Sequence, residues 1–199
     1  MGNFISSYCK INSAGLWHDG KLLYESSGEN TLDELYKKMD LSYPKFFKMD
    51  YLSKLGILAS ELLLKNHSIP GNKISIVLSN KSSSLQTDNN YLKSMESFPS
   101  PSLFVYTLPN IVTGEICIKH KITGENAFFI EQQFNAELLF SYTESLLKHS
   151  QAALCGWVES ENNHFEAFLY FVEKGSESTR KSSTFMGHTT EQINTLYKQ

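Results

Sequence analysis

Cysteine is scarce in this chain: only three cysteines occur among its 199 residues, at Cys9, Cys117 and Cys155. They form no Cys-x-x-Cys pair, and their odd number excludes a fully paired disulfide framework. Each lies among apolar residues, where cysteine behaves as a small hydrophobic side chain. We therefore expect free thiols in a reducing compartment, and hence a cytoplasmic protein.

The sequence also has no apolar run of the roughly 20 residues that cross a bilayer. Residues 1–10 lack the basic and then apolar order of a signal peptide. The net charge is −3, and no block of like charge stands out. This charge pattern excludes the polybasic surfaces that bind nucleic acid or anionic membranes, so we expect neither as a partner.

Motifs for common cofactors and nucleophiles are missing as well. There is no Gly-x-Gly-x-x-Gly, no phosphate-binding loop and no Gly-x-Ser-x-Gly elbow. The histidines have no ligand spacing to one another or to cysteine, and they are His18, His67, His120, His149, His164 and His188. We therefore expect no metal site and no cofactor.

The chain does contain enough apolar sequence for one packed domain, with 41% apolar and 13% aromatic residues. Runs rich in β-branched and aromatic residues predict strands at 8–13, 73–78, 127–130, 152–159 and 165–172, the last two as a hairpin. Asp19-Gly20 predicts a tight turn. Helical spacing predicts helices at 31–39, 48–65, 89–96, 106–120, 134–149 and 189–197.

Local signals refine these helices and the chain's end. Thr31 with Glu34 has the spacing of a capping box, Asp88 is a candidate cap, and either Thr189 or Thr190 caps the final helix. A helix over 106–120 requires Pro109 in its first turn. Residues 174–184 are rich in serine and predict a flexible linker. Strand and helix alternation predicts an α/β protein, with helices on both faces of a mixed sheet.

One junction is a candidate for chemistry. The strand at 127–130 runs into a helix expected to begin near Gln133. Free N–H groups and the positive end of the helix dipole gather at such a place and can hold an oxyanion or lower the pKa of a thiol. A plain strand-to-helix connection remains the alternative.

Several segments, in order, resemble the N-terminal half of the β-ketoacyl synthases. They are Lys48-Met-Asp50, Ile76-Val-Leu-Ser-Asn80, Pro99-Ser-Pro101, Leu108-Pro-Asn110 with Gly114-Glu-Ile116, Gly124-Glu-Asn126 and the strand 152–159. The resemblance extends from about residue 11 to residue 174. It implies a thiolase-like half domain, with a mostly parallel five-stranded sheet over residues 1–175 and a linker with a terminal helix over 176–199.

The resemblance also implies where the family's nucleophilic cysteine would stand. Counted from Gly124, that position is Gln133, flanked by Glu131 and Gln132. An amide side chain cannot form a thioester. The family's two catalytic histidines belong to a second half that has no counterpart in these residues, and His164 and His188 match no family motif.

Glutamine at this position is similar to the chain-length-factor subunits that pair with an active synthase. The short form resembles those of bacterial aryl-polyene and flexirubin-type pathways. The resemblance therefore implies a non-catalytic subunit that pairs with itself or with a full-length synthase, and acyl carrier protein as a further partner. The expected interface residues are Tyr106, Leu108, Asn110, Phe128 and Ile130.

Two alternatives remain open on the sequence. The first is an enzyme acting on acyl thioesters, with Glu131 as base or Cys117 as nucleophile. The second is a binding module for acyl chains or acyl carrier protein. The leucines at 48–65 fall at helical spacing, which favours a helix packed in the core over a groove that binds lipid.

Overall fold

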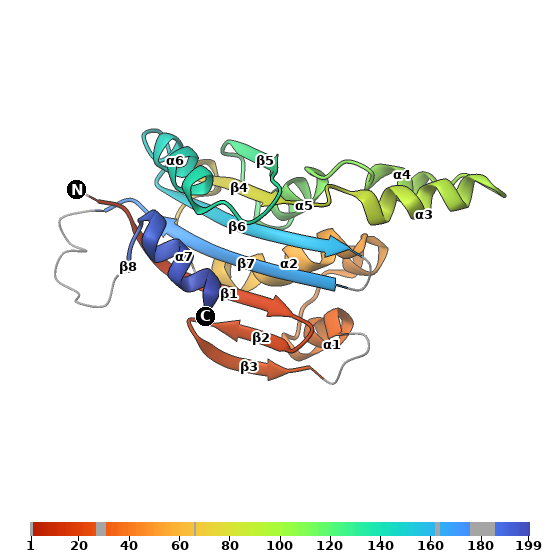
Figure 1. The fold of residues 1–199 in the computed structure, drawn as a ribbon, viewed down its shortest axis with the longest axis horizontal. Coiled ribbons are helices and arrows are strands. Elements are labelled where there is room, and N and C mark those ends of the chain that lie inside the picture. The colour runs from red at the N-terminus through yellow and green to blue at the C-terminus, as the bar shows by residue number, and fades with distance from the viewer. Residues whose placement is uncertain (1, 27–30, 66, 162–163, 176–185) are drawn as a thin grey trace.

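A single mixed sheet organises the molecule, as the computed structural model shows for residues 2–26, 31–65, 67–161, 164–175 and 186–199 (Figure 1). Within these ranges, no helix has both the length and the apolar character that crossing a bilayer requires. The elements in chain order are β1 (Phe4–Asn12), β2 (Gly15–His18), β3 (Lys21–Glu25), α1 (Thr31–Lys38), η1 (Pro44–Lys48), α2 (Tyr51–Leu64), η2 (Gly71–Lys73), β4 (Ile74–Asn80), α3 (Leu85–Met95), α4 (Pro101–Val105), α5 (Ile111–His120), β5 (Asn126–Ile130), α6 (Ala136–Leu146), β6 (Ala152–Glu161), β7 (His164–Glu173), β8 (Met186–Gly187) and α7 (Thr190–Lys198).

The strands lie in the order β3-β2-β1-β7-β6-β4-β5, with β8 pairing with β1 beyond that path. The prediction of an α/β protein with a mixed sheet is confirmed. The described residues form eight strands rather than the five expected, and the additional ones are the short β2, β3 and β8. The remaining five are mostly parallel in direction, as predicted, because β1, β4, β5 and β6 run the same way and β7 runs against them. Apart from the parallel pairs of β4 with β5 and with β6, the pairs are antiparallel, including the predicted β6–β7 hairpin.

The unpredicted strands β2 and β3 flank the turn that the sequence did predict. Asp19 and Gly20 both have positive φ, 48° and 75°, which is the backbone of a tight hairpin turn. The Asp19 carboxylate accepts a hydrogen bond from the Tyr8 amide at 2.9 Å, which ties the turn to β1. Both strands are short and alternate poorly, so the sequence pattern showed the turn alone.

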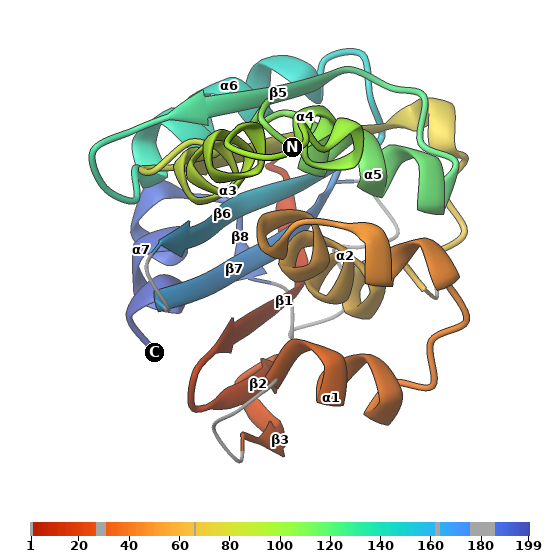
Figure 2. The same cartoon turned by 90° about the vertical axis from the view of Figure 1, so that its right-hand side faces the viewer.

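Helices cover both faces of the sheet, as predicted (Figure 2). On one face α1, α2 and α5 enclose a core that includes Leu55 and Leu58, so α2 is a core helix as expected. On the other face α6 and α7 enclose a second core, to which α7 contributes Ile193 and Leu196. The final helix is thus packed on the sheet, while residues 176–185 of the predicted linker lie outside the described residues.

The helix starts on either side of α4 differ from the prediction. Helix α3 begins at Leu85, so Asp88 lies in its first turn and is not its cap. Helix α5 begins at Ile111, after Pro109 rather than around it, because Pro109 lies in the turn that joins α5 to the separate helix α4. Thr189 is confirmed as the cap of α7, since its side chain accepts a hydrogen bond from Gln192 N at 3.1 Å. Thr31, by contrast, is the first residue of α1.

Helices α3 and α4 form an arm that projects beyond the sheet (Figure 1). Its base is tied down by Thr87, whose hydroxyl donates to Asp50 at 2.9 Å, and by Ser84, whose hydroxyl donates to the carbonyl of residue 107 at 2.6 Å. Its outer part is apolar and exposed, with Phe98 81% exposed. The arm is therefore tied at its base to the rest of the fold.

Candidate functional site

Strand β5 forms one edge of the sheet, and among the described residues only β4 pairs with it. The ladder with β4 extends past both ends of β5. Ile76 N donates to the carbonyl of Glu125 at 2.9 Å, and Glu131 N donates to the carbonyl of Asn80 at 2.8 Å. Because alternate residues of a strand turn their backbone groups to opposite sides, the N–H and C=O of Asn126, Phe128 and Ile130 point away from β4.

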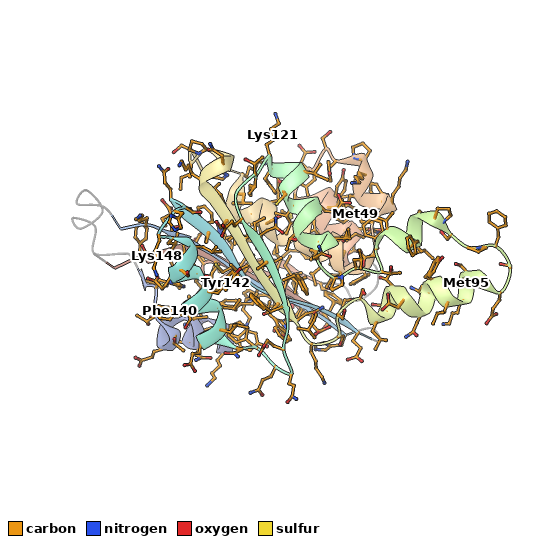
Figure 3. The ribbon with its side chains drawn as sticks, turned by 90° about the horizontal axis from the view of Figure 1, so that it is seen from above. Met49, Met95, Lys121, Phe140, Tyr142 and Lys148 are labelled. Atoms are coloured by element: carbon orange, nitrogen blue, oxygen red, sulfur yellow. The ribbon has the colours of Figure 1, made fainter. Side chains whose placement is uncertain are left out.

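The side chains of β5 hold this edge in place. Phe128 packs against the core beneath α2 and α5. On the other face, the ring of Phe129 meets that of Tyr142 at 5.0 Å, edge to face. Ile130 remains 51% exposed. Figure 3 looks down on this edge, with α6 and its Tyr142 to one side and the arm with Met95 far to the other. The strand is thus anchored by its side chains, while its outer backbone stays available.

The junction after β5 does not have the geometry that the sequence predicted. Helix α6 begins at Ala136 and is capped by Asn135, whose Oδ1 accepts a hydrogen bond from Leu138 N at 3.0 Å. Gln132 and Gln133 are exposed residues of the preceding bend. Gln133 therefore lies outside the helix start, and the prediction of a helix beginning near Gln133 is corrected by three residues.

Phe134, the next residue, pins this bend to the C-terminal helix. Its ring stacks on Tyr197 with centroids 3.9 Å apart and an angle of 19°. Residues 131–137 line an open, polar hollow of about 550 Å³ together with Thr190 and Asn194 of α7. The contact between this bend and α7 was not predicted from the sequence, although the aromatic residues Phe134 and Tyr197 were a possible signal.

The expected interface residues fall into two groups. Leu108 is 58% exposed, Ile130 is 51% exposed and Asn110 is also at the surface, while Phe128 is half-buried. Tyr106 differs from the expectation of a surface residue, because it is only 6% exposed and its hydroxyl donates a hydrogen bond to Glu115 at 3.2 Å. Burial and the neighbouring carboxylate raise the pKa of Tyr106, so this side chain is part of a buried polar contact.

The thiols are not arranged for nucleophilic chemistry. Cys9 and Cys155 are fully buried, and burial raises the pKa of each to about 12. Cys117 is half-buried on α5, and burial raises its pKa as well. Since the thiolate is the nucleophile, these shifts reduce reactivity at neutral pH. Cys117 lies on α5, a different element from the bend that contains Gln133. Glu131, the candidate base of the enzyme alternative, accepts a hydrogen bond from Asn135 at 3.0 Å.

The buried histidines act as structural contacts. His188 lies with Nδ1 2.7 Å from Glu144, and burial lowers its pKa. His120 lies 3.2 Å from the Ser60 hydroxyl, and burial lowers its pKa to about 4. Among the described residues, no group of three His, Cys, Asp or Glu side chains could hold a metal ion.

Comparison with known proteins identifies the fold. No protein-family model and no curated protein matches the sequence. The structure matches a chain of the ketosynthase ApeO in complex with its chain length factor ApeC from Xenorhabdus doucetiae. The TM-score is 0.62 at 14% identity, over 89% of this chain and 81% of that one. It also matches the ishigamide ketosynthase/chain length factor, with a TM-score of 0.63 at 13% identity, over 92% of this chain and 64% of that one. The chain thus has the thiolase-like fold of these proteins.

Proposed function

We propose that this chain is a non-catalytic, ketosynthase-like subunit of a polyketide or fatty-acid assembly system, and that it pairs with a ketosynthase along β5. The observation that carries the proposal is the outer edge of β5, where Asn126, Phe128 and Ile130 direct backbone groups that no described strand takes up. An edge of this kind is a template for strand pairing with another chain.

The choice of partner is supported by the fold. The two similar structures are named as ketosynthases with chain length factors, so the shared fold occurs in assemblies of that kind. A bacterial aryl-polyene or flexirubin-type pathway is the narrower assignment, and the resemblance of this short chain to the chain-length-factor-like subunits supports it.

The lack of catalysis is proposed from the side chains. Gln133 stands in an exposed bend at the position that the resemblance gives to the nucleophile, and its amide cannot carry an acyl group. The three cysteines of the sequence all have pKa values raised by burial. Condensation would therefore belong to the partner.

Co-expression with each ketosynthase of the source genome tests the pairing. We expect a stable heteromer with one of them. Ile130→Pro should abolish it, because proline removes the outward N–H and blocks the edge at a half-exposed residue. Ile130→Val keeps that N–H and is the matched control. A heteromer that survives Ile130→Pro, or none with any ketosynthase, would contradict pairing along β5.

Intact-mass measurement after incubation with malonyl- and hexanoyl-acyl carrier protein tests the lack of catalysis. We expect the mass of the chain to stay unchanged, because no thiol is placed or activated for transfer. An acyl adduct that disappears in Cys117→Ser would instead establish an acyl-transferring enzyme.

A further inference from the structure

A glutamate lies at each end of β5. Glu125 immediately precedes the strand and Glu131 immediately follows it, and both lie in the ladder with β4 through their backbones. Glu125 is exposed and Glu131 is partly exposed. Among the ion pairs of the described residues, none involves either glutamate. The edge is therefore flanked by two carboxylates that form no ion pair among the described residues, although Glu131 accepts a hydrogen bond from Asn135.

A second copy of the chain would bring these charges together. Two β5 strands pair antiparallel with the most hydrogen bonds when they are centred on Phe128, since Asn126 then faces Ile130 of the other copy and all outward backbone groups are used. In that register Glu125 of each copy lies opposite Glu131 of the other. These are non-hydrogen-bonded pairs, whose Cα atoms are only about 4.5 Å apart.

Like charges directly opposite each other on paired strands are destabilising. Two-fold symmetry makes this repulsion occur twice, once at each end of the paired strands. Sliding the strands by two residues avoids it, but Asn126 or Ile130 then loses its partner. Self-pairing therefore either opposes like charges or gives up hydrogen bonds.

We propose that Glu125 and Glu131 select a partner unlike this chain, namely an edge strand with lysine or arginine at the positions opposite them. This inference rests on the proposed pairing along β5 and adds the rule that determines which strand is accepted. The two carboxylates act as a barrier to self-association and as the attractive contact for a basic-flanked strand.

The isolated chain tests the barrier through a charge swap. Glu125→Lys converts both like-charge pairs of the self-dimer into opposite-charge pairs, so we expect its dimer dissociation constant to fall by about tenfold or more. The double variant Glu125→Lys/Glu131→Lys restores like charges and should return to the weak self-association of the wild type. Sedimentation velocity at low salt, over a range of concentrations, measures all three proteins. In about 0.5 M salt the difference should shrink because exposed charges are screened.

Two controls assign the effect to this edge. Glu25→Lys makes the same charge change at the end of β3, on the opposite edge of the sheet, and should leave self-association as in the wild type. Adding Ile130→Pro to Glu125→Lys should remove the new dimer. A wild-type dimer that Ile130→Pro dissociates, or a Glu125→Lys variant no tighter than Glu25→Lys, would overturn the inference.

The ketosynthase complex separates failure of this inference from failure of the proposed function. Glu125→Lys should weaken that complex by about tenfold, because it places like charges against the partner's basic residue. A β5-dependent complex that ignores Glu125→Lys would refute the charge rule and leave the pairing intact. If no complex forms with any ketosynthase, the proposed function itself fails.

Discussion

Strands β5 and β6 are the two parallel neighbours of β4, yet they differ in how far they are buried. β6 is buried along all of its length except its last residue, while β5 is exposed at both ends. Asn-Ala-Phe-Phe-Ile of β5 is similarly apolar to the first seven residues of β6, Ala-Ala-Leu-Cys-Gly-Trp-Val. The difference arises because β7 takes up the far side of β6, and no described strand does so for β5. The burial of a strand thus depends on whether strands pair with both of its sides, as well as on its composition.

The largest effect should come from breaking the central strand at Gly156. This residue has φ +151°, and a Cβ there would lie 2.0 Å from the carbonyl oxygen of Phe168 on β7. Gly156→Ala should therefore lower the free energy of unfolding by about 3 kcal/mol or more, as measured by urea denaturation. Gly114→Ala is the control, since its Cβ meets nothing within 4 Å in α5 and should gain up to about 1 kcal/mol. Equal effects at the two glycines would contradict the strain at β6.

Truncating one aliphatic side chain in each strand compares how much side-chain packing in β6 and in β5 contributes to stability. Leu154 of β6 is fully buried, so Leu154→Ala should lower the free energy of unfolding by about 2–5 kcal/mol. Ile130 of β5 is 51% exposed, so Ile130→Ala should lower it by less than about 1 kcal/mol. Urea denaturation with a shared m-value gives both numbers. Similar losses would mean that a further segment covers the edge in solution.

Thiol labelling sharpens the comparison without changing stability. Cys155 on β6 has its pKa raised to about 12 by burial, so at pH 8 only about one thiol in ten thousand is ionised. We expect iodoacetamide to modify half-buried Cys117 first and Cys155 only as the protein unfolds. Mass spectrometry of digests over time gives the order. Rapid modification of Cys155 would show that the centre of the sheet opens locally.

The smallest effect is expected at Gln133. Its side chain is exposed in the bend after β5, so Gln133→Ala should change the free energy of unfolding by no more than about 0.5 kcal/mol. The heteromer with a ketosynthase should also be retained. Phe134→Ala is the contrasting variant, since it removes the stack on Tyr197 and should be clearly destabilising. A large loss at Gln133 instead would indicate a role for its amide that the exposed bend does not explain.

The features that the sequence predicted well are local ones. Asp19-Gly20 gave the turn, Thr189 gave the cap of α7, and the apolar run at 127–130 gave β5. Asn135 could have corrected the start of α6, because asparagine before the apolar Leu138 and Leu139 is a favourable cap.

The features that the sequence did not predict depend on distant partners. The apolar run at 127–130 reads alike for an edge strand and a central strand, because sheet order is decided by pairing between remote segments. Tyr106 looked like a surface residue because its partner Glu115 lies on the next helix. The short strands β2 and β3 needed β1 beside them before they could form a sheet.

The position of β1 has a consequence for synthesis of the chain. β1 pairs with β7 in a register that joins Phe4 to Glu173 and Asn12 to Glu166. While the ribosome makes the chain, the first strand must therefore wait with one side unsatisfied until more than 150 residues have followed it. Closure of such remote contacts is slow. We expect nascent chains arrested before β7 to be cleaved readily by proteases and to stay bound to chaperones. Chains arrested after β7 should resist proteolysis.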